Sequence, residues 1–424
     1  MKPSCVKRQS VQRINPLRRT VESGMSTVSA LRTMRLSVRS AIVGFALCTA
    51  CSGASSFLSR DRPATAYDRY ARALIEAGLD STALGQEWLA ASDSALRTPL
   101  SAALPALEVG TYTRTEARAV AYRFSLKDGQ QVTVRMRADG LPARLYLDLF
   151  EVTDDTLPRF VHRATADALT SLDSAAAKLS LEHEASEDAD YVLRLQPELL
   201  RSGRYELSIG IQPTLAFPVE GRGNAAIQSF FGANRDAGRR VHHGIDIFAP
   251  RGTPVVAATD GIVRSVNPSN LGGNVVWLSD DVRGQSLYYA HLDTQVVVAG
   301  QRVRLGDTLG FVGNTGNARN TPPHLHFGIY RRGRGPIDPL LHVQQITRAA
   351  PRLGADTARL GAFATTTGAD VKLRDGPSKS SHALRVMARD ASVQIMGVSA
   401  NWYRVQLADG TAGYLAADAL RLVD

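Results

Sequence analysis

Two short stretches decide the expected fold and site: V-H-H-G-I-D-I-F-A-P at residues 241–250 and P-P-H-L-H-F-G at residues 322–328. The region from His242 to His326 contains five of the nine histidines of a 424-residue chain. Neutral imidazoles and carboxylates are ligands that zinc prefers in proteins. The clustering of histidines therefore predicts a metal site.

The spacing within each stretch indicates extended chain. His324 and His326 are two residues apart, so both imidazoles project from one face of a strand. His242 and Asp246 are four apart, and Gly244 between them favours a short extended run over a helix. Two facing strands would then supply His242, Asp246 and either His324 or His326 as ligands to one tetrahedrally coordinated ion. Three protein ligands with a fourth position open to water are typical of catalytic zinc.

Either motif alone is common in proteins that bind no metal, so the prediction rests on the two together. The four histidines outside this region are expected to be ordinary packed or surface residues: His162, His183, His342 and His382.

The segment from about Phe217 to Pro339, under a third of the chain, resembles the catalytic domain of the LytM/lysostaphin-type zinc metallopeptidases, which cut peptide bonds in bacterial peptidoglycan. Their His-x-x-x-Asp and His-x-His signatures are met by the two stretches quoted above. The family also has a strand histidine between them, here His291 in L-Y-Y-A-H-L. Other similar pieces, in the same order, are F-F-G at 230–232, A-P-R-G-T-P-V at 249–255 and G-N-T-G at 313–316.

The resemblance implies that His242, Asp246 and His326 are the zinc ligands and that His291 and His324 are the catalytic pair. His243 is next to the first ligand, but the four-residue spacing to Asp246 favours His242. A zinc ion makes hydroxide available near neutral pH, and a neighbouring histidine can move the water's proton to the leaving amine. The chain has no H-E-x-x-H motif, so a glutamate base on that motif is excluded.

The formal net charge of +10 does not indicate a nucleic-acid partner. Residues 1–40 contain nine Lys or Arg and one acidic residue, Glu22, and contribute +8, which leaves +2 for the other 384 residues. There is neither a basic patch nor a Walker loop, and we expect no nucleic-acid binding.

The basic segment precedes an apolar run at residues 40–50 that ends before Cys51. This pattern is typical of a secretion signal, and the run is too short to span a bilayer as a mature helix. Met34 would give a more usual signal length than Met1. Small residues before Cys51 resemble a lipoprotein processing box, with Cys48 where leucine is usual. We expect a lipid anchor at Cys51 and a place in the cell envelope, in the outer membrane or periplasm of a Gram-negative cell. A plain cleaved signal peptide is the alternative.

The fold class is mainly β and multi-domain. Apolar spacing over 65–97 predicts a helical hairpin, and period-two alternation as in Q-V-T-V-R-M-R at 131–137 predicts a β-sandwich. N-W-Y-R-V-Q-L at 401–407 and G-T-A-G-Y-L at 410–415 resemble a bacterial Src-homology-3-like domain. The expected order is a signal segment (1–51), a tether and helical hairpin (52–107), a β-sandwich (108–214), an antiparallel β metallopeptidase core (215–343), a linker (344–366) and a small β-barrel (367–424).

These observations predict a zinc endopeptidase acting on the peptide cross-links of peptidoglycan. Two alternatives remain at this point. Some relatives lose the ligands and activate a separate amidase, whereas here all the ligands are present. The second alternative is a secreted protease that cuts glycine-rich proteins. A lipid anchor would disfavour this alternative, because it would hold the enzyme near the cell wall.

Overall fold

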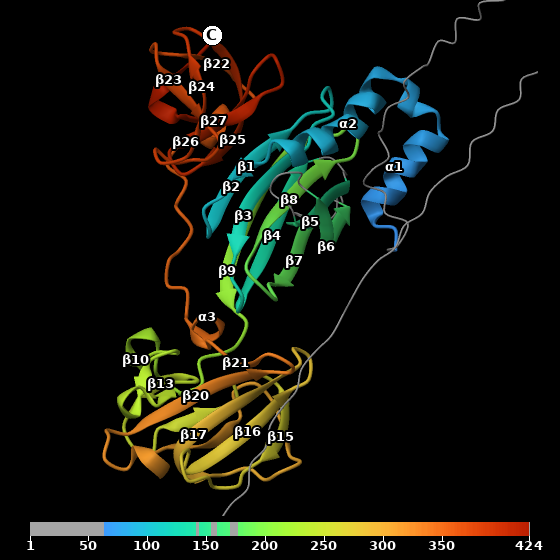
Figure 1. Ribbon diagram of the computed structural model, residues 1–424. Helices are drawn as coiled ribbons and strands as arrows, with labels where there is room; N and C mark the ends of the chain where they lie inside the picture. Colours follow the sequence, from blue (N-terminus) through green and yellow to red (C-terminus); the bar gives the residue numbers. More distant parts are fainter. Residues whose placement is uncertain (1–62, 141–143, 154–158, 170–176, 424) are drawn as a thin grey trace, which may run out of the picture. The chain divides into compact units, whose positions relative to one another are not determined.

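The computed structural model describes residues 63–140, 144–153, 159–169 and 177–423 (Figure 1). The expected signal segment, the start at Met34 and the lipidation of Cys51 lie outside the described residues. Within those residues, no helix combines the length and the apolar character needed to cross a membrane.

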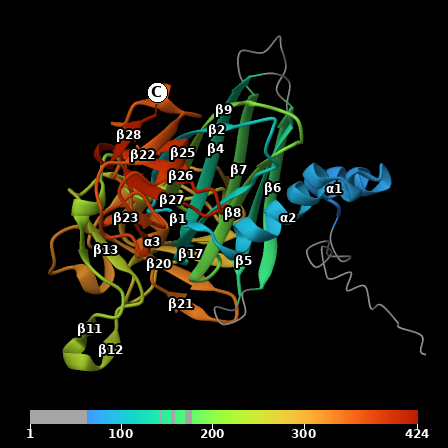
Figure 2. The same cartoon turned by 90° about the horizontal axis from the view of Figure 1, so that it is seen from above.

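The predicted helical hairpin consists of α1 (Ala66–Glu76) and α2 (Ala83–Arg97). Thr65 and Asp68 form a capping box at the start of α1, and Gly78 takes a positive φ of 71° between the helices. The hairpin packs on the domain that follows, as Figure 2 shows. Trp88 of α2 is 0% exposed, stacks on Tyr67 with ring centroids 5.0 Å apart, and donates its N–H to the Pro197 carbonyl at 2.8 Å.

The predicted β-sandwich has two sheets enclosing one apolar core. One sheet has the order β1-β3-β8-β5-β6. The other contains β2-β9-β4-β7. The strand bounds are β1 Leu100–Ser101, β2 Ala106–Tyr112, β3 Val120–Leu126, β4 Gln130–Gly140, β5 Arg144–Val152, β6 Phe160–Leu169, β7 Ala177–Glu184, β8 Ala189–Pro197 and β9 Gly203–Pro213. The period-two alternation is visible in β9, whose Tyr205, Leu207 and Ile209 are buried.

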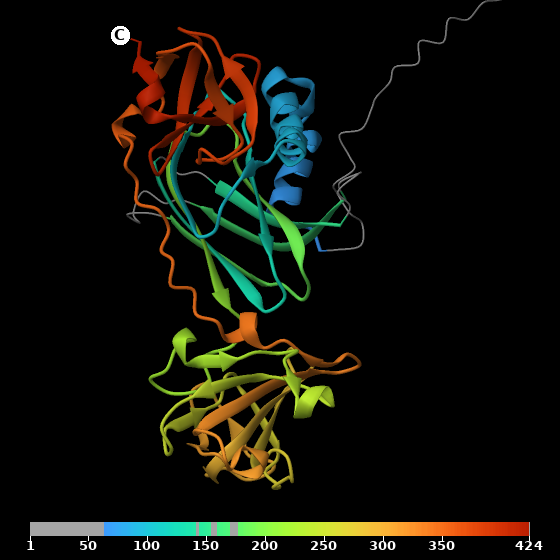
Figure 3. The same cartoon turned by 60° about the vertical axis from the view of Figure 1, so that its left-hand side comes forward.

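The C-terminal strands are β22 Phe363–Thr366, β23 Val371–Arg374, β24 Ala383–Met387, β25 Ser392–Ser399, β26 Trp402–Gln406, β27 Ala412–Ala416 and β28 Leu420–Leu422. Residues 344–356 form a stretch without regular structure, and a short 3-10 helix at Thr357–Arg359 then precedes these strands (Figure 3). Strand β22 lies inside the segment expected to be a linker (344–366), and it pairs with β25 and β28. The C-terminal β unit therefore begins at Phe363, earlier than residue 367.

Strand β25 also pairs with β2, so the C-terminal strands and one sandwich sheet form a single sheet. A buried polar cluster lies beside this junction. The Glu108 carboxylate accepts hydrogen bonds from Arg404 Nε at 2.9 Å, Tyr122 at 2.6 Å and Tyr414 at 2.5 Å. Arg404 and Glu108 are both buried, so each charge depends on the other for compensation.

The metallopeptidase-like core is built on an antiparallel sheet with the strand order β10-β13-β20-β17-β16-β15-β18. Its elements are β10 Ile227–Ser229, β11 Asn234–Arg235, β12 Arg240–Val241, β13 Ile245–Phe248, β14 Pro254–Val256, β15 Gly261–Ser265, β16 Asn274–Asp280, β17 Gln285–Gln295, β18 Arg302–Val303, β19 Thr308–Val312, β20 His324–Arg331, β21 Gly335–Ile337 and α3 Leu340–Val343. Leu325, Phe327 and Ile329 of β20 enter the apolar core. The alternate residues, including His324 and His326, therefore lie on the opposite face.

His342 of α3 is a buried residue rather than a surface one. Its Nδ1 is 3.1 Å from the Thr214 hydroxyl, and its ring packs so closely on Gly129 that a Cβ there would be 2.8 Å from it. Burial lowers the pKa of His342 to about 4. The neutral form is therefore the one that fits this packing.

Candidate metal centre

Asp246 and His326 face each other across neighbouring strands. Asp246 of β13 is directly opposite His326 of β20 in the antiparallel register. His242 reaches the same point from outside the strand, because β12 ends at Val241 and β13 begins at Ile245. The expectation that His242 and Asp246 share one extended run is therefore wrong for His242. Gly244 makes this path possible, since a Cβ there would be 2.4 Å from the Phe327 carbonyl oxygen and 2.9 Å from the His326 ring.

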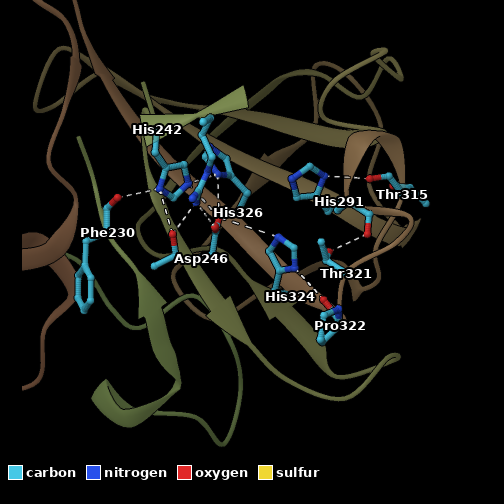
Figure 4. A network of polar contacts seen from close by, with 12 residues as sticks. Phe230, His242, Asp246, His291, Thr315, Thr321, Pro322, His324 and His326 are labelled. Carbon is cyan, nitrogen blue, oxygen red and sulfur yellow. Dashed lines mark hydrogen bonds and ion pairs between the residues drawn. The ribbon is translucent and has the colours of Figure 1, made fainter. Parts of the chain in front are cut away.

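Three ligand-type atoms converge at this point (Figure 4). His242 Nε2 is 3.0 Å from Asp246 Oδ1 and 2.9 Å from His326 Nδ1, and His326 Nδ1 is 3.0 Å from Asp246 Oδ1. Of the described residues, these three form the group suited to holding a metal ion. Bonds of about 2.0–2.1 Å to a tetrahedral zinc place ligand atoms roughly 3.3 Å apart. The observed spacing is close to that value.

The protonation of these three ligand atoms is also compatible with a bound cation. His242 Nδ1 is 2.8 Å from the Phe230 carbonyl oxygen, which can only accept, so Nδ1 carries the proton and Nε2 presents a lone pair. Asp246 Oδ1 is an acceptor as well. At most one proton, on His326 Nδ1, is available to three converging acceptors. A metal ion bound by lone pairs from all three would satisfy them together.

Arg235 holds the other oxygen of the carboxylate. Its Nη2 donates to Asp246 Oδ2 at 2.8 Å and to the Ser229 hydroxyl at 2.5 Å. Burial alone would raise the pKa of Asp246, but its polar contacts with His242 and His326 outweigh burial and hold the pKa well below its ordinary value. The carboxylate is therefore ionised, with Oδ1 directed at the candidate site.

His291 and His324 lie beside this group with the same orientation of their protons. The Nδ1 of His291 donates to the Thr315 carbonyl at 2.9 Å, and that of His324 donates to the Pro322 carbonyl at 2.8 Å. Each ring therefore presents an unprotonated Nε2. The two ring centroids are 5.1 Å apart, and His324 Nε2 is 4.0 Å from Asp246 Oδ1. Burial, reinforced by the neighbouring histidines, lowers the pKa of His291 to about 4.

His243 lies apart from the group. Its side chain is exposed, and its ring is 6.4 Å from that of Phe231. The structure thus brings together the five predicted residues His242, Asp246, His291, His324 and His326 and leaves His243 outside.

The sequence motifs did not indicate Arg235 or Ser229 as residues of the site. The carbonyls of Phe230 and Thr315 fall within pieces of the family resemblance, but no residue type identifies a carbonyl acceptor.

Comparisons with known proteins identify two parts of the chain. The family model described as peptidase family M23 matches residues 240–339, and that of the bacterial SH3 domain matches residues 369–421. The L-Ala–D-Glu endopeptidase of Bacillus subtilis (strain 168) is 34% identical over 140 residues, covering 30% of this chain and 43% of that protein. The peptidoglycan DD-endopeptidase ShyC of Vibrio cholerae is 39% identical over 103 residues, covering 22% of each.

The catalytic domain of lysostaphin from Staphylococcus simulans is 31% identical, with 27% of this chain and 87% of that chain covered and a TM-score of 0.25. The chain spans less than half of the length of the two curated relatives above. This chain accordingly carries a peptidase domain of family M23, followed by a bacterial SH3 domain.

Proposed function

We propose that this protein is a zinc-dependent endopeptidase that hydrolyses peptide cross-links of bacterial peptidoglycan. The observation that carries the proposal is the convergence of His242 Nε2, Asp246 Oδ1 and His326 Nδ1 within 2.9–3.0 Å of one another, beside two further histidines with free Nε2 atoms. The first three would hold the ion. In that site a zinc ion would bring the pKa of a bound water down toward neutral and would polarise the scissile carbonyl.

The chain's own residues supply proton transfer. His291 and His324 each have an unprotonated Nε2, so as neutral rings they accept a proton rather than donate one. One of them takes the proton of the attacking water and then, as an imidazolium, can donate to the developing oxyanion or to the leaving amine. A donor role for His291 toward the oxyanion requires that it first acquire this proton.

The intact set of ligands and neighbouring histidines favours an enzyme over an activator of a separate amidase. The bond is not fixed by the relatives, because their names give three different bonds at similar identity. These are an L-Ala–D-Glu endopeptidase at 34%, a DD-endopeptidase at 39% and the glycyl-glycine endopeptidase ALE-1 of Staphylococcus capitis at 39%. The bacterial SH3 domain supports peptidoglycan as the partner, and we propose the cell envelope as the location, with a lipid anchor at Cys51.

The test is digestion of purified sacculi by the full-length chain in a non-ionic detergent, with mass spectrometry of the released muropeptides. We expect zinc-dependent loss of cross-linked dimers and no cleavage of the glycan itself. His326→Ala, loaded under the same conditions, is the matched negative control. Unchanged sacculi with a zinc-loaded wild-type protein would refute the proposed activity, and cleavage of a pentaglycine peptide alone would favour the protease of glycine-rich proteins.

A further inference from the structure

The sheet face that carries His324 and His326 continues into three aromatic side chains on three adjacent strands. Tyr330 lies on β20, Tyr288 on β17 and Trp277 on β16. Trp277 is paired with Tyr288 across the sheet, and Tyr288 with Gly328. Their strand neighbours Val276, Leu278, Leu287 and Ile329 are in the core on the opposite face. The three rings therefore share the face of the candidate metal centre.

The rings contact one another and reach the centre. Trp277 is 4.4 Å from Tyr288 and 5.0 Å from Tyr330 between ring centroids, and Tyr288 is 5.8 Å from His326 in an edge-on arrangement. We call Trp277, Tyr288 and Tyr330 the aromatic platform. It is continuous with the catalytic face, so a polymer whose peptide bond lies at the metal centre must pass beside it or over it.

The platform is open to solvent and carries free polar groups. All three rings are partly exposed. In the part of the chain that the structure describes, the Trp277 indole N–H and the Tyr330 hydroxyl have no hydrogen-bond partner, and neither atom is buried. Tyr288 is fixed from one side, since a Cβ on Gly272 would be 2.0 Å from its hydroxyl. Partly exposed aromatic rings with unpartnered polar groups are suited to stacking on a ligand and to forming hydrogen bonds with it.

We propose that the aromatic platform binds an N-acetylated amino sugar of the glycan strand whose attached peptide is cut at the metal centre. This inference rests on the proposed function. A pyranose ring has an apolar C–H face that stacks on aromatic rings, and its hydroxyl and acetamido oxygens accept hydrogen bonds from groups such as an indole N–H. A peptide of small residues offers little apolar surface for three rings.

The separation between the aromatic platform and the candidate metal centre is compatible with a sugar bound at the platform. Tyr330 is four residues from His326 along β20, which is about 13 Å at 3.3 Å per residue. An extended peptide covers the same distance in about four residues. The peptides of peptidoglycan are only a few residues long and hang from the sugar strand. A peptide held at the metal centre and directed along β20 therefore brings its sugar end to the platform.

The experiment compares two substrates that differ only in their sugars: a cross-linked muropeptide dimer with its disaccharides, and the same peptide dimer from which they have been removed. The proteins are the zinc-loaded full-length chain, Trp277→Ala, Tyr330→Ala and the control Val282→Ser, whose side chain is 92% exposed in the turn between β16 and β17. We expect kcat/KM on the sugar-bearing dimer to fall about tenfold in the two platform variants, the loss of one good stacking contact. The sugar-free dimer and the control should change less than about twofold.

Binding of an N-acetylglucosamine tetramer, followed by saturation transfer from the protein to the NMR signals of the tetramer itself, gives a readout that is independent of cleavage and of the Trp277 indole. Saturable binding by the wild type that Trp277→Ala abolishes and Trp277→Tyr retains supports the proposal. Zinc content and melting temperature identify any variant that misfolds, in which case Trp277→Tyr and Tyr330→Phe replace the alanine variants.

Equal loss on both dimers would show that the platform binds the peptide, and no loss on either, without tetramer binding, would show that it is only packing. Either result overturns the proposal. If the wild type cleaves neither dimer, the proposed activity fails, and tetramer binding alone then supports or overturns the platform.

Discussion

Arg235 gives the sharpest prediction about metal binding. Replacing it with methionine keeps most of the side-chain volume but removes the donor that is 2.8 Å from Asp246 Oδ2. Loss of a hydrogen bond to a charged group costs about 1.5–3 kcal/mol, which corresponds to roughly 10–150-fold in affinity. The Arg235 side chain is 34% exposed, so water replaces part of the lost contact. We therefore expect zinc to bind about tenfold more weakly, at the lower end of the range for partners of metal ligands.

The assay is a competition titration of zinc against a chromophoric chelator, which gives the dissociation constant without reference to activity. Arg302→Met is the matched control, because Arg302 is exposed on β18 of the same domain. Arg235→Lys should fall between methionine and wild type, since a single ammonium can keep one of the two contacts that the guanidinium makes with Asp246 and Ser229.

An unchanged zinc dissociation constant in Arg235→Met would refute the reasoning. If turnover of the cross-linked substrate fell in that protein while zinc affinity stayed at the wild-type value, Arg235 would act on the substrate rather than on the orientation of Asp246. His326→Ala, which removes a ligand atom, must lose zinc in the same titration for the comparison to hold.

Four further outcomes are expected. His291→Ala and His324→Ala should keep near-stoichiometric zinc by plasma mass spectrometry while turnover falls roughly 10²- to 10⁴-fold, because they remove a proton acceptor and not a ligand; a zinc-free His324 variant would make it a ligand. The depressed pKa of His342, about 4, means that the unfolded chain takes up the proton first as pH falls, so the free energy of unfolding should decrease between about pH 6.5 and 4, by up to about 3 kcal/mol. Urea midpoints at both ends should show this decrease in the wild type and a smaller decrease in His342→Gln, where His291, whose pKa is also about 4, still contributes. Arg404→Met leaves its carboxylate partner buried and uncompensated and should cost about 3–5 kcal/mol in urea unfolding, and a cost below 1 kcal/mol would mean that the carboxylate is protonated or hydrated. Cys51→Ala should move the protein from the membrane to the soluble envelope fraction, and a wild type that is already soluble would contradict the lipid anchor.

The strands were predictable where burial is one-sided. In β9, for example, Tyr205, Leu207 and Ile209 alternate with less buried residues, and that period appears directly in the sequence. The union of β25 with β2 was not predictable, because a pairing such as Val109 with Val398 depends on the placement of two domains and not on local pattern. For the same reason the expected linker, 344–366, includes Phe363–Thr366, which forms a strand only through its pairing with distant partners.

At the candidate site, the sequence suggested which side chains lie together but not the groups that hold them in place. The four-residue and two-residue spacings suggested His242, Asp246 and a histidine of β20, and the structure brings them together. The supporting acceptors are backbone carbonyls of Phe230, Thr315 and Pro322, whose directions depend on loop conformation. Loop conformation of this kind leaves no trace in residue type.

His291 shows how far period-two reasoning can mislead at such a site. Leu287 and Tyr289 of β17 are in the core, so regular alternation would direct His291 into the core as well. Its ring instead lies 5.1 Å from His324 and 5.9 Å from His326, on the opposite face, and Leu292 takes the place in the core. The reversal occurs where His291 adopts a positive φ of 64° and the pairing of β17 with β19 shifts register.

A non-glycine residue in this backbone region costs of order 1–3 kcal/mol and persists where surrounding contacts enforce it. Here the His291 N–H donates to the Gly272 carbonyl at 2.7 Å and the imidazole Nδ1 to the Thr315 carbonyl at 2.9 Å, so both ends of the residue are held. The irregularity in the strand makes the His291 side chain project from the opposite face of the sheet. A histidine that regular alternation would place in the core therefore lies beside the candidate metal centre. Only the likeness of L-Y-Y-A-H-L to the family motif could predict that position, because nothing in its local periodicity does.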